Sequence, residues 1–124
     1  MQFEEFKEKN IVITGAASGI GRAQAEAFLA RGASVFGIDV QEKVLTHEAY
    51  THFVGSVTDS CFIQEVAAKL TNVHILCNTA GILDGYAKTL ETDEALWDRV
   101  FNVNVKGMYI VTNALLPKML EQKA

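Results

Sequence analysis

A glycine-rich segment at residues 14–21 carries the strongest chemical signal in the sequence. It reads Thr-Gly-Ala-Ala-Ser-Gly-Ile-Gly and lies between a short β-branched run and a helical pattern. Glycine at these positions permits a tight turn, lets the backbone approach a pyrophosphate and lets a helix pack closely on a sheet. The free N–H groups at the start of that helix then point at the phosphates, aided by the helix dipole. The alternative is a glycine-rich turn that binds nothing.

An acidic side chain stands where a bound nucleotide would place its sugar. Asp39 ends the second predicted strand, 18 residues after Gly21. A carboxylate at this point accepts hydrogen bonds from an adenosine ribose and repels a 2′-phosphate. Neither residues 17 and 18 nor the two residues after Asp39 carry a positive charge. The pattern therefore favours NAD over NADP, with a solvated strand-end aspartate as the alternative.

The cysteines and histidines show no functional spacing. Cys61 and Cys77 stand alone, without a C-x-x-C pair or a histidine at ligand distance. We therefore expect no zinc site and no disulfide framework, and a reduced, cytoplasmic setting. The histidines at 47, 52 and 74 have neither ligand nor triad spacing. We expect His74, inside a predicted strand, to be a hydrogen-bonded core or edge residue.

Short apolar runs alternate with helical patterns along the chain, which indicates βαβ units with parallel strands and right-handed crossovers. We predict an α/β fold, a Rossmann-like doubly wound parallel sheet in a single domain. The expected strands are residues 10–14, 33–38, 50–54 and 73–77. The expected helices are residues 19–31, a helix capped by Thr58 or Asp59, and a long helix that is capped by Thr92 and runs from Asp93 towards Pro117.

The last predicted helix is apolar on two sides. One stripe consists of Leu96, Val100, Val103 and Ile110, and the other of Trp97, Phe101, Val105 and Met108. One stripe is expected to face the sheet. Because monomers rarely expose a large apolar patch, the second is covered either by chain absent from this sequence or by another subunit. We favour a homo-oligomer formed through the last helix.

Composition narrows the classes of partner. The chain has 124 residues, of which 49% are hydrophobic and 21% charged, and a formal net charge of −4. This is ordinary globular composition, and the absence of a basic block argues against a nucleic-acid partner. No apolar run approaches the roughly 18 residues that cross a bilayer. The charged N-terminal segment does not have the pattern of a signal peptide.

The glycine spacing T-G-x-x-x-G-x-G resembles that of the short-chain dehydrogenase/reductase family. Two further segments support the resemblance. Residues 78–81, Asn-Thr-Ala-Gly, are similar to the family's N-N-A-G, and residues 97–107 are similar to the helix motif around its active-site asparagine. The three motifs occur in the family's order and cover most of the chain. Within the family the chain looks most like bacterial 3-oxoacyl-(acyl-carrier-protein) reductases and related carbonyl or alcohol dehydrogenases.

The resemblance implies a cofactor site. Asp39 would contact the adenosine ribose, and two residues after the third strand, Ser56 and Val57, would contact the adenine. Those expected at the pyrophosphate and adjoining ribose are Gly15, Ser18, Gly19, Ile20 and Gly21. Those expected to line the cofactor and brace the sheet are Asn78, Ala80 and Gly81.

The resemblance also implies one catalytic residue, Asn104, which would kink the helix and hold a water in a proton relay. Asn102 is distinguished from it only by the motif alignment. Two positions depart from the family pattern. Ser56 stands where the family usually has an acidic residue, and Thr79 replaces the second asparagine of N-N-A-G.

The family's proton-transfer group is not found in these residues. Family chemistry uses a tyrosine, a lysine four residues later that lowers the tyrosine pKa, and a serine that orients the carbonyl. A free phenol titrates near 10, so a cation is needed for work near neutrality. None of the tyrosines at 50, 86 and 109 has a lysine at that spacing. The family places this group downstream, so residues 1–124 are expected to be the N-terminal part of a single NAD(P)-binding Rossmann domain, ending after the fourth strand and the long helix.

The function expected from the resemblance is that of an NAD-dependent oxidoreductase. It would move hydride between nicotinamide and a small-molecule carbonyl or secondary alcohol, with activity in a full-length parent and none in the 124 residues alone. A non-catalytic dinucleotide-binding module and a structural fragment that binds nothing are the alternatives. The isolated chain is expected to be marginally stable or to associate through its fourth strand and last helix.

Overall fold

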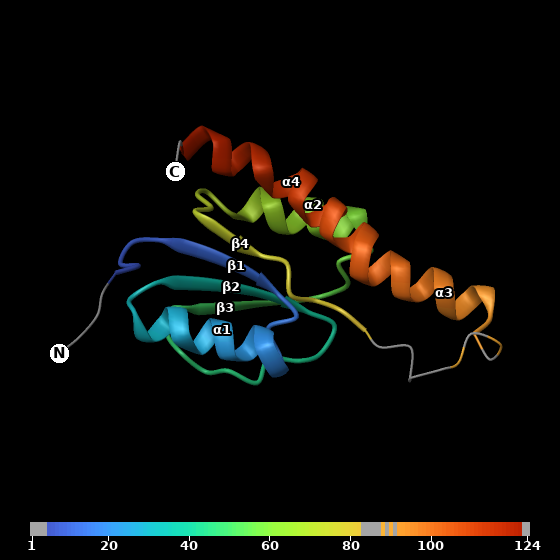
Figure 1. Ribbon diagram of the computed structural model, residues 1–124. Coiled ribbons are helices and arrows are strands. Elements are labelled where there is room, and N and C mark those ends of the chain that lie inside the picture. The colour runs from blue at the N-terminus through green and yellow to red at the C-terminus, as the bar shows by residue number, and fades with distance from the viewer. Residues whose placement is uncertain (1–4, 83–87, 89, 91, 123–124) are drawn as a thin grey trace.

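A parallel four-stranded sheet forms the centre of the molecule (Figure 1). The structure is a computed structural model that describes residues 5–82, 88, 90 and 92–122. The strand order is β3-β2-β1-β4, and all three pairings are parallel. The strands are β1 (Asn10–Thr14), β2 (Ser34–Asp39), β3 (Tyr50–Val54) and β4 (Ile75–Cys77). This order confirms the prediction of an α/β, Rossmann-like doubly wound sheet.

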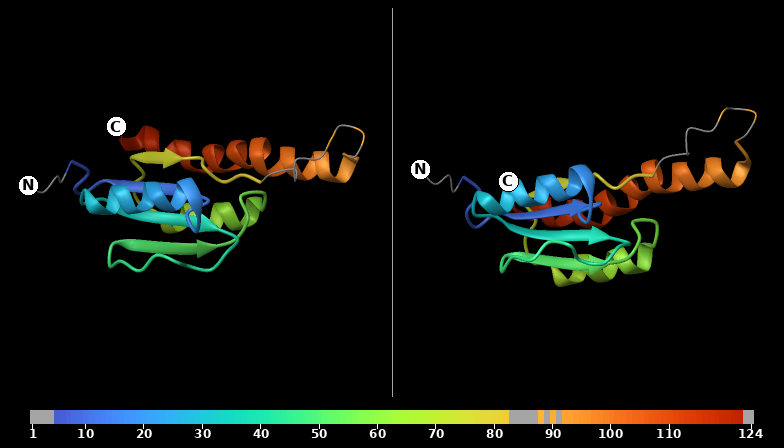
Figure 2. Two further views of the ribbon diagram at one scale, coloured as in Figure 1. Left: turned by 60° about the horizontal axis from the view of Figure 1, so that its bottom comes forward. Right: turned by 90° about the horizontal axis from the view of Figure 1, so that it is seen from below.

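Helices cover both faces of the sheet (Figures 1 and 2). Helix α1 (Gly19–Ala30) lies on one face, while α2 (Ser60–Lys69) and α4 (Gly107–Gln122) lie on the other. Helix α3 (Glu94–Phe101) continues into α4 through a π-helical segment at Asn102–Lys106. Figure 1 shows α3 extending beyond the carboxyl ends of the strands, and no α3 residue is buried.

The core explains why the central strand is apolar at nearly every position. Successive side chains of a strand point to opposite faces of a sheet. Ile11 and Ile13 pack with Leu29 on the α1 side, whereas Val12 packs with Val111 on the α2 and α4 side. Burial on both faces produces the continuous apolar run that predicted this strand.

The fourth strand is shorter than predicted. It begins at Ile75 rather than at Val73. Val73 is fully buried in the core, and His74 ends the ladder through an exchange with Asn10: its N–H donates to the Asn10 carbonyl (2.9 Å), and its Nδ1 accepts the Asn10 N–H (2.9 Å). The expectation that His74 is a hydrogen-bonded residue is confirmed.

The start and end of the long helix differ from the prediction. Asp93, and not Thr92, is the cap, because its carboxylate accepts the Leu96 N–H at 2.8 Å. The Thr92 hydroxyl instead donates to the carbonyl of Lys88 at 3.0 Å. The helix also continues through Pro117 to Gln122. Proline lacks the N–H that would bond the carbonyl four residues earlier, but this position is exposed, so water can take that place.

The two apolar stripes of the long helix have different surroundings. Ile110 lies in the core, and Leu96, Val100 and Val103 of the same stripe are half-buried. The second stripe is exposed at all four positions, and two of its rings, Trp97 and Phe101, stack with centroids 4.6 Å apart. The prediction that one stripe faces the sheet is therefore confirmed only for Val103 and Ile110, which pack on the core, because Leu96 and Val100 belong to α3, which extends beyond the strands.

Several predicted absences concern the part of the chain that the structure describes. Cys61 and Cys77 are both free thiols. Among the described residues, no three His, Cys, Asp or Glu side chains gather as a metal site would require. Within the same residues, no helix combines the length and apolarity needed to span a membrane.

Candidate functional site

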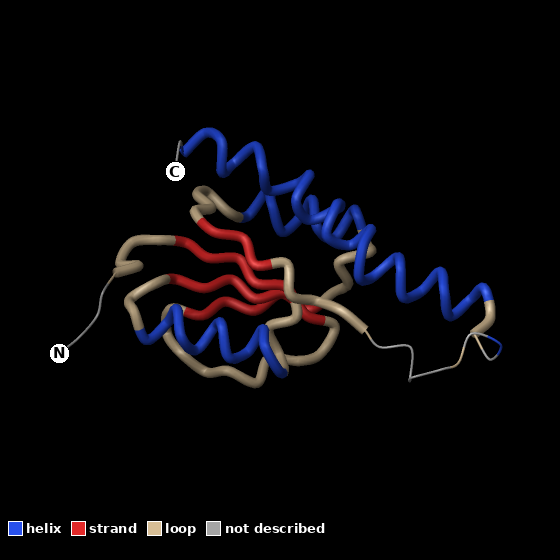
Figure 3. Tube along the Cα trace, viewed as in Figure 1, coloured by secondary structure: helices blue, strands red, loops and turns tan. Residues whose placement is uncertain are grey.

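A cavity of about 400 Å³ lies at the carboxyl ends of the strands. Parallel strands present these ends at one edge of the sheet, and Figure 3 shows the loops that follow them meeting there. This edge, near the change in chain direction between β1 and β4, is where open α/β sheets bind ligands. The cavity is lined by Gly15, Ser18, Ile20, Gly21, Ile38, Asp39, Val40, Gln41, Gly55, Ser56, Val57, Thr79, Ala80, Gly81, Ile82 and Val103.

The glycine turn packs too closely for side chains. Gly15 has φ +72°, and a Cβ there would lie 2.9 Å from the Cα of Ala80. A Cβ on Gly21 would collide with the Gly15 carbonyl. Gly19 differs, because its φ is +56° and nothing lies within 4 Å of the place its Cβ would take. The turn is thus closed on its inner side and open where a ligand would approach the backbone.

The first turn of α1 has unused donors. Ser18 is the N-cap, and its side chain makes no capping hydrogen bond. The first bond within the helix runs from the Arg22 N–H to the Ser18 carbonyl at 3.3 Å. The earlier N–H groups therefore remain for an anionic ligand, which the helix dipole also favours.

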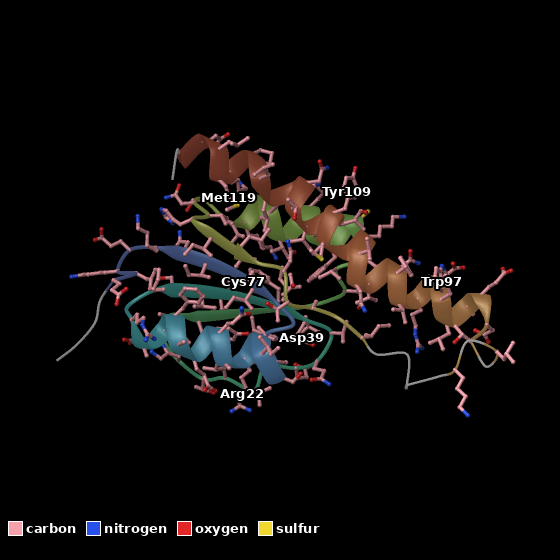
Figure 4. All side chains as sticks on the ribbon, in the orientation of Figure 1. Arg22, Asp39, Cys77, Trp97, Tyr109 and Met119 are labelled. Carbon is pink, nitrogen blue, oxygen red and sulfur yellow. The ribbon has the colours of Figure 1, made fainter. Side chains whose placement is uncertain are left out.

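Asp39 joins the glycine turn to the loop after β2 (Figure 4). Its Oδ2 accepts the Ala17 N–H at 2.9 Å, and its Oδ1 accepts the Gln41 N–H at 2.9 Å. A carboxylate has about four lone-pair sites, so each oxygen retains capacity for a ligand hydroxyl. Among the described residues that line the cavity, none is lysine or arginine. The end of the cavity at Asp39 is therefore anionic.

Thr14 does not line the cavity, but it holds two residues that do, Thr79 and Ala80. It is 1% exposed, and its hydroxyl oxygen accepts the N–H groups of Thr79 (3.0 Å) and Ala80 (2.9 Å). The Thr79 hydroxyl in turn donates to Oε1 of Gln24 on α1 at 2.6 Å. Sequence reasoning gave Thr14 no role of its own, although a hydroxyl at the end of a buried strand must find a partner.

Asn78 lies behind the cavity and not in its lining. Its Nδ2 donates to Oγ1 of Thr112 on α4 at 3.0 Å, which ties the end of β4 to that helix. Its Oδ1 is buried and has no hydrogen-bond partner in the described structure. Ala80 and Gly81, predicted together with it, do line the cavity.

Ser56 and Val57 also line the cavity, but their side chains have structural partners. Val57 is buried, and a Cβ on Gly107 would lie 2.5 Å from its Cγ2. The Ser56 hydroxyl accepts the Thr58 N–H at 3.1 Å and lies 2.7 Å from the Thr58 hydroxyl. These bonds shape the turn that leads to Asp59, the residue whose side chain caps α2.

Asn104 lies in the π-helical segment and bonds one residue twice. Its Oδ1 accepts the Ile82 N–H at 2.7 Å, and its Nδ2 donates to the Ile82 carbonyl at 2.9 Å. Ile82 and Val103 line the cavity, so Asn104 acts directly behind its wall. Asn102 is exposed. π-Helical turns within α-helices occur frequently at functional sites.

Most of the predicted site residues line the cavity. Gly19, Asn78 and Asn104 lie outside its lining. Sequence reasoning missed the lining residues Ile38, Val40, Gln41, Gly55, Thr79, Ile82 and Val103. Most are ordinary apolar or small residues, and the signal that could have found several of them is their position directly after a strand.

Comparisons with known proteins agree with this geometry. The family model described as short chain dehydrogenase matches residues 9–124. Dehydrogenase/reductase SDR family member 6 of Rattus norvegicus is 40% identical over 120 residues, covering 94% of this chain and 49% of its own. The 3-oxoacyl-[acyl-carrier-protein] reductase of Thermotoga maritima is 37% identical over 128 residues, covering 93% of this chain and 52% of its own.

A solved structure shows the same arrangement. The 3-ketoacyl-(acyl-carrier-protein) reductase of Brucella melitensis, complexed with NADH, superposes with a TM-score of 0.86 at 27% identity. The match covers 94% of this chain and 52% of that one. The chain thus spans about half the length of each of these three relatives.

Proposed function

This chain belongs to the short chain dehydrogenase family, and we propose that it forms the cofactor-binding part of an NAD-dependent oxidoreductase. The reaction is hydride transfer between nicotinamide and a carbonyl or secondary alcohol. The Thermotoga and Brucella relatives support a 3-oxoacyl thioester on acyl carrier protein as the substrate class. The observation that carries the proposal is the convergence of the glycine turn and Asp39 on one cavity.

The residues at the cavity fit a dinucleotide. The open face of Gly19 and the unused donors of the α1 first turn suit a pyrophosphate, which Gly15, Ser18, Ile20 and Gly21 would border. A volume of about 400 Å³ lies within the usual range for small-molecule sites. The cofactor supplies the hydride chemistry when bound, and the chain supplies binding and orientation.

The charge at the ribose end supports NAD rather than NADP. The Asp39 carboxylate can accept the two ribose hydroxyls, whereas a 2′-phosphate would bring a second negative charge to the same place. None of the described lining residues offers a compensating cation. NAD is therefore the proposed cofactor, and Ser56 and Val57 are proposed to border the adenine.

Asn104 is the residue proposed to take part in catalysis, at the end of the cavity beyond Gly81. Its two bonds to Ile82 fix the cavity wall beyond Gly81, where the nicotinamide would lie. We assign it the further role of holding a water in the proton relay. Asn78, tied to α4, is proposed to brace the sheet beside it.

A second copy of the chain is the proposed partner. The exposed stripe of Trp97, Phe101, Val105 and Met108 runs along α3, the π-helical segment and α4. Burying such a patch against its own copy would remove apolar surface from water. The free thiols of Cys61 and Cys77 support a reducing, cytoplasmic location.

Titration of the chain with NADH and with NADPH, followed by calorimetry, tests the proposal. NADH is expected to bind with the lower Kd. Binding of neither dinucleotide would overturn the proposal and favour a fragment that binds nothing. NADH oxidation with an acetoacetyl thioester is expected to be absent, because these 124 residues contain no Tyr-x-x-x-Lys. Turnover by the chain alone would overturn the assignment of proton transfer to that group.

A further inference from the structure

Two side chains of β3 form a hydrogen-bonded pair that the proposed function leaves without a role. Tyr50 and His52 are two residues apart in the strand, so both point to the face that α1 covers. The Tyr50 hydroxyl lies 2.6 Å from Nδ1 of His52. Nε2 of His52 lies 2.9 Å from the carbonyl oxygen of Gln41, in the loop after β2. The pair thus connects β3 to a residue that lines the cavity.

The partners fix the direction of these hydrogen bonds. A backbone carbonyl only accepts, so Nε2 of His52 must carry the proton and donate to Gln41. Nδ1 of the neutral ring is then an acceptor, and the Tyr50 hydroxyl donates to it. Burial, and secondarily the negative charge of Asp39, raises the pKa of Tyr50 to about 12, so the phenol keeps the proton that it donates.

The connection continues to the glycine turn. The Gln41 N–H donates to Oδ1 of Asp39, and the Ala17 N–H donates to Oδ2 of the same carboxylate. Four hydrogen bonds therefore run from Tyr50 through His52, Gln41 and Asp39 to the turn. His52 does not line the cavity, so it can act on a ligand only through the backbone that it holds.

The middle of β2 leaves space for the pair. His52 is paired with Gly37 in the sheet register. A Cβ at Gly37 would collide with the Tyr50 hydroxyl and would lie 2.8 Å from the Cβ of Ala16. The φ of Gly37 is not positive, so the reason for glycine here is space and not backbone conformation.

We propose that His52 is a positioning residue for nucleotide selection, which acts by holding the Gln41 backbone that orients Asp39 towards the ribose. This inference rests on the proposed function. Without the bond from His52, the loop after β2 loses a tether and the carboxylate is less preorganised. NADH then loses affinity because its ribose must order the carboxylate on binding. NADPH, which does not gain from that carboxylate, loses less.

Three variants of the whole chain test this proposal by titration with NADH and NADPH. His52→Phe keeps a ring but removes both hydrogen bonds, and is expected to raise the NADH Kd about tenfold with little change for NADPH. His52→Gln retains an N–H that can reach the Gln41 carbonyl, and is expected to keep the Kd ratio within about threefold of the parent. Tyr50→Phe removes the hydroxyl but leaves His52 as a donor, and is expected to resemble His52→Gln.

A second measurement on the unmutated chain does not depend on cofactor or on variant folding. Nitrogen-15 NMR of the histidines is expected to show His52 as the neutral tautomer protonated at Nε2. A tautomer protonated at Nδ1 would overturn the proposal. The proposal would also be overturned if the folded His52→Phe chain had a lower Tm but the same ratio of NADH Kd to NADPH Kd as the parent. If the parent chain binds neither dinucleotide, the proposed function fails, and this inference fails with it. If the parent binds NADH but His52→Phe leaves the Kd ratio unchanged, only this inference fails.

Discussion

Asp39 has two tasks at the scale of single residues. Its oxygens accept N–H groups from Ala17 and Gln41, and the residue also lines the cavity. Thr14, directly before the glycine turn, accepts the N–H groups of Thr79 and Ala80 and so ties the end of β1 to the segment after β4. The glycine turn itself is held by the bond from Ala17 to Asp39. A substitution at Asp39 will change both local order and binding.

Asp39→Ala is expected to weaken NADH binding more than NADPH binding. Loss of hydrogen bonds to a charged group costs about 1.5–3 kcal/mol, which is a rise of about tenfold to a hundredfold in the NADH Kd. Glu42→Ala, an exposed acidic residue three positions later, is the matched control and is expected to change neither Kd. Calorimetric titration of both variants with NADH and with NADPH measures these Kd values. Equal effects of Asp39→Ala on both nucleotides would contradict the ribose assignment.

The raised pKa of Tyr50 predicts that the free energy of unfolding falls at alkaline pH. Its folded pKa of about 12 lies above the ordinary value of 10, so between these pH values the unfolded chain loses a proton that the folded chain keeps. The contribution of Tyr50 is complete below pH 10 and is lost as pH rises to 12. Urea unfolding of parent and Tyr50→Phe should show about 1–3 kcal/mol of extra decline in the parent over this interval.

The control for this experiment is another tyrosine. Tyr109→Phe removes an exposed hydroxyl on α4 (Figure 4) and is expected to leave the pH profile of the parent unchanged. If Tyr50→Phe keeps the full alkaline decline, burial of Tyr50 is not its cause.

At the scale of elements, the π-helical segment is the feature that brings a helix side chain to the cavity wall. Asn104 matches both backbone groups of Ile82, as a neighbouring strand would. An amide supplies one acceptor and one donor to this pairing, whereas a carboxylate supplies acceptors only. The segment therefore depends on asparagine itself at this position.

Asn104→Asp is expected to reduce the free energy of unfolding by about 1–3 kcal/mol, because a carboxylate oxygen would face the Ile82 carbonyl without a donor. Asn102→Asp makes the same chemical change two residues earlier at an exposed position, and is expected to have little effect. Urea unfolding at neutral pH compares the two. An equal loss of stability in both variants would contradict the role given to Asn104.

The elements differ in how far sequence could predict them. The strands at Asn10–Thr14 and Tyr50–Val54 have the predicted bounds, since short runs rich in β-branched and aromatic residues that are followed by glycine are typical of strands. The prediction that Thr92 caps α3 was wrong, because Thr92 and Asp93 are adjacent and both residue types are good N-caps. Only the three-dimensional placement of Lys88, which accepts the Thr92 hydroxyl, distinguishes them.

The residues of the site also differ in how far the sequence could predict them. The glycine turn and Asp39 were found because their residue types and spacing are unusual. The Tyr50–His52 pair was not found, since its partner Gln41 belongs to a loop whose path the sequence does not define. The lining residues Ile38 and Val103 have side chains that any core contains, so only the shape of the cavity reveals them.

At the scale of the whole molecule, the sheet and the long helix are unequally covered. Helices α1, α2 and α4 bury the two faces of the sheet, while α3 extends beyond it (Figure 2) and leaves Trp97 and Phe101 exposed. β4 pairs with β1 on one side only within the described structure. These are the surfaces through which association is expected.

Phe101→Glu combined with Met108→Glu is expected to convert a self-associating chain to a monomer, because two charges would enter the exposed stripe. Ala27→Glu adds a charge at an exposed position of α1, on the opposite face of the sheet, and is expected to leave association unchanged. Sedimentation velocity of the three chains measures the outcome. A parent chain that sediments as a compact monomer would contradict the proposed oligomer.

Amide NMR of the nitrogen-15-labelled chain during titration with NAD tests whether the dinucleotide binds at the glycine turn. The largest shifts are expected at the amides of residues 15–21 and of Asp39 and Gln41, with smaller shifts at Thr79 and Ala80. Saturable shifts confined to another surface, or none at all at millimolar NAD, would contradict a dinucleotide site at the glycine turn.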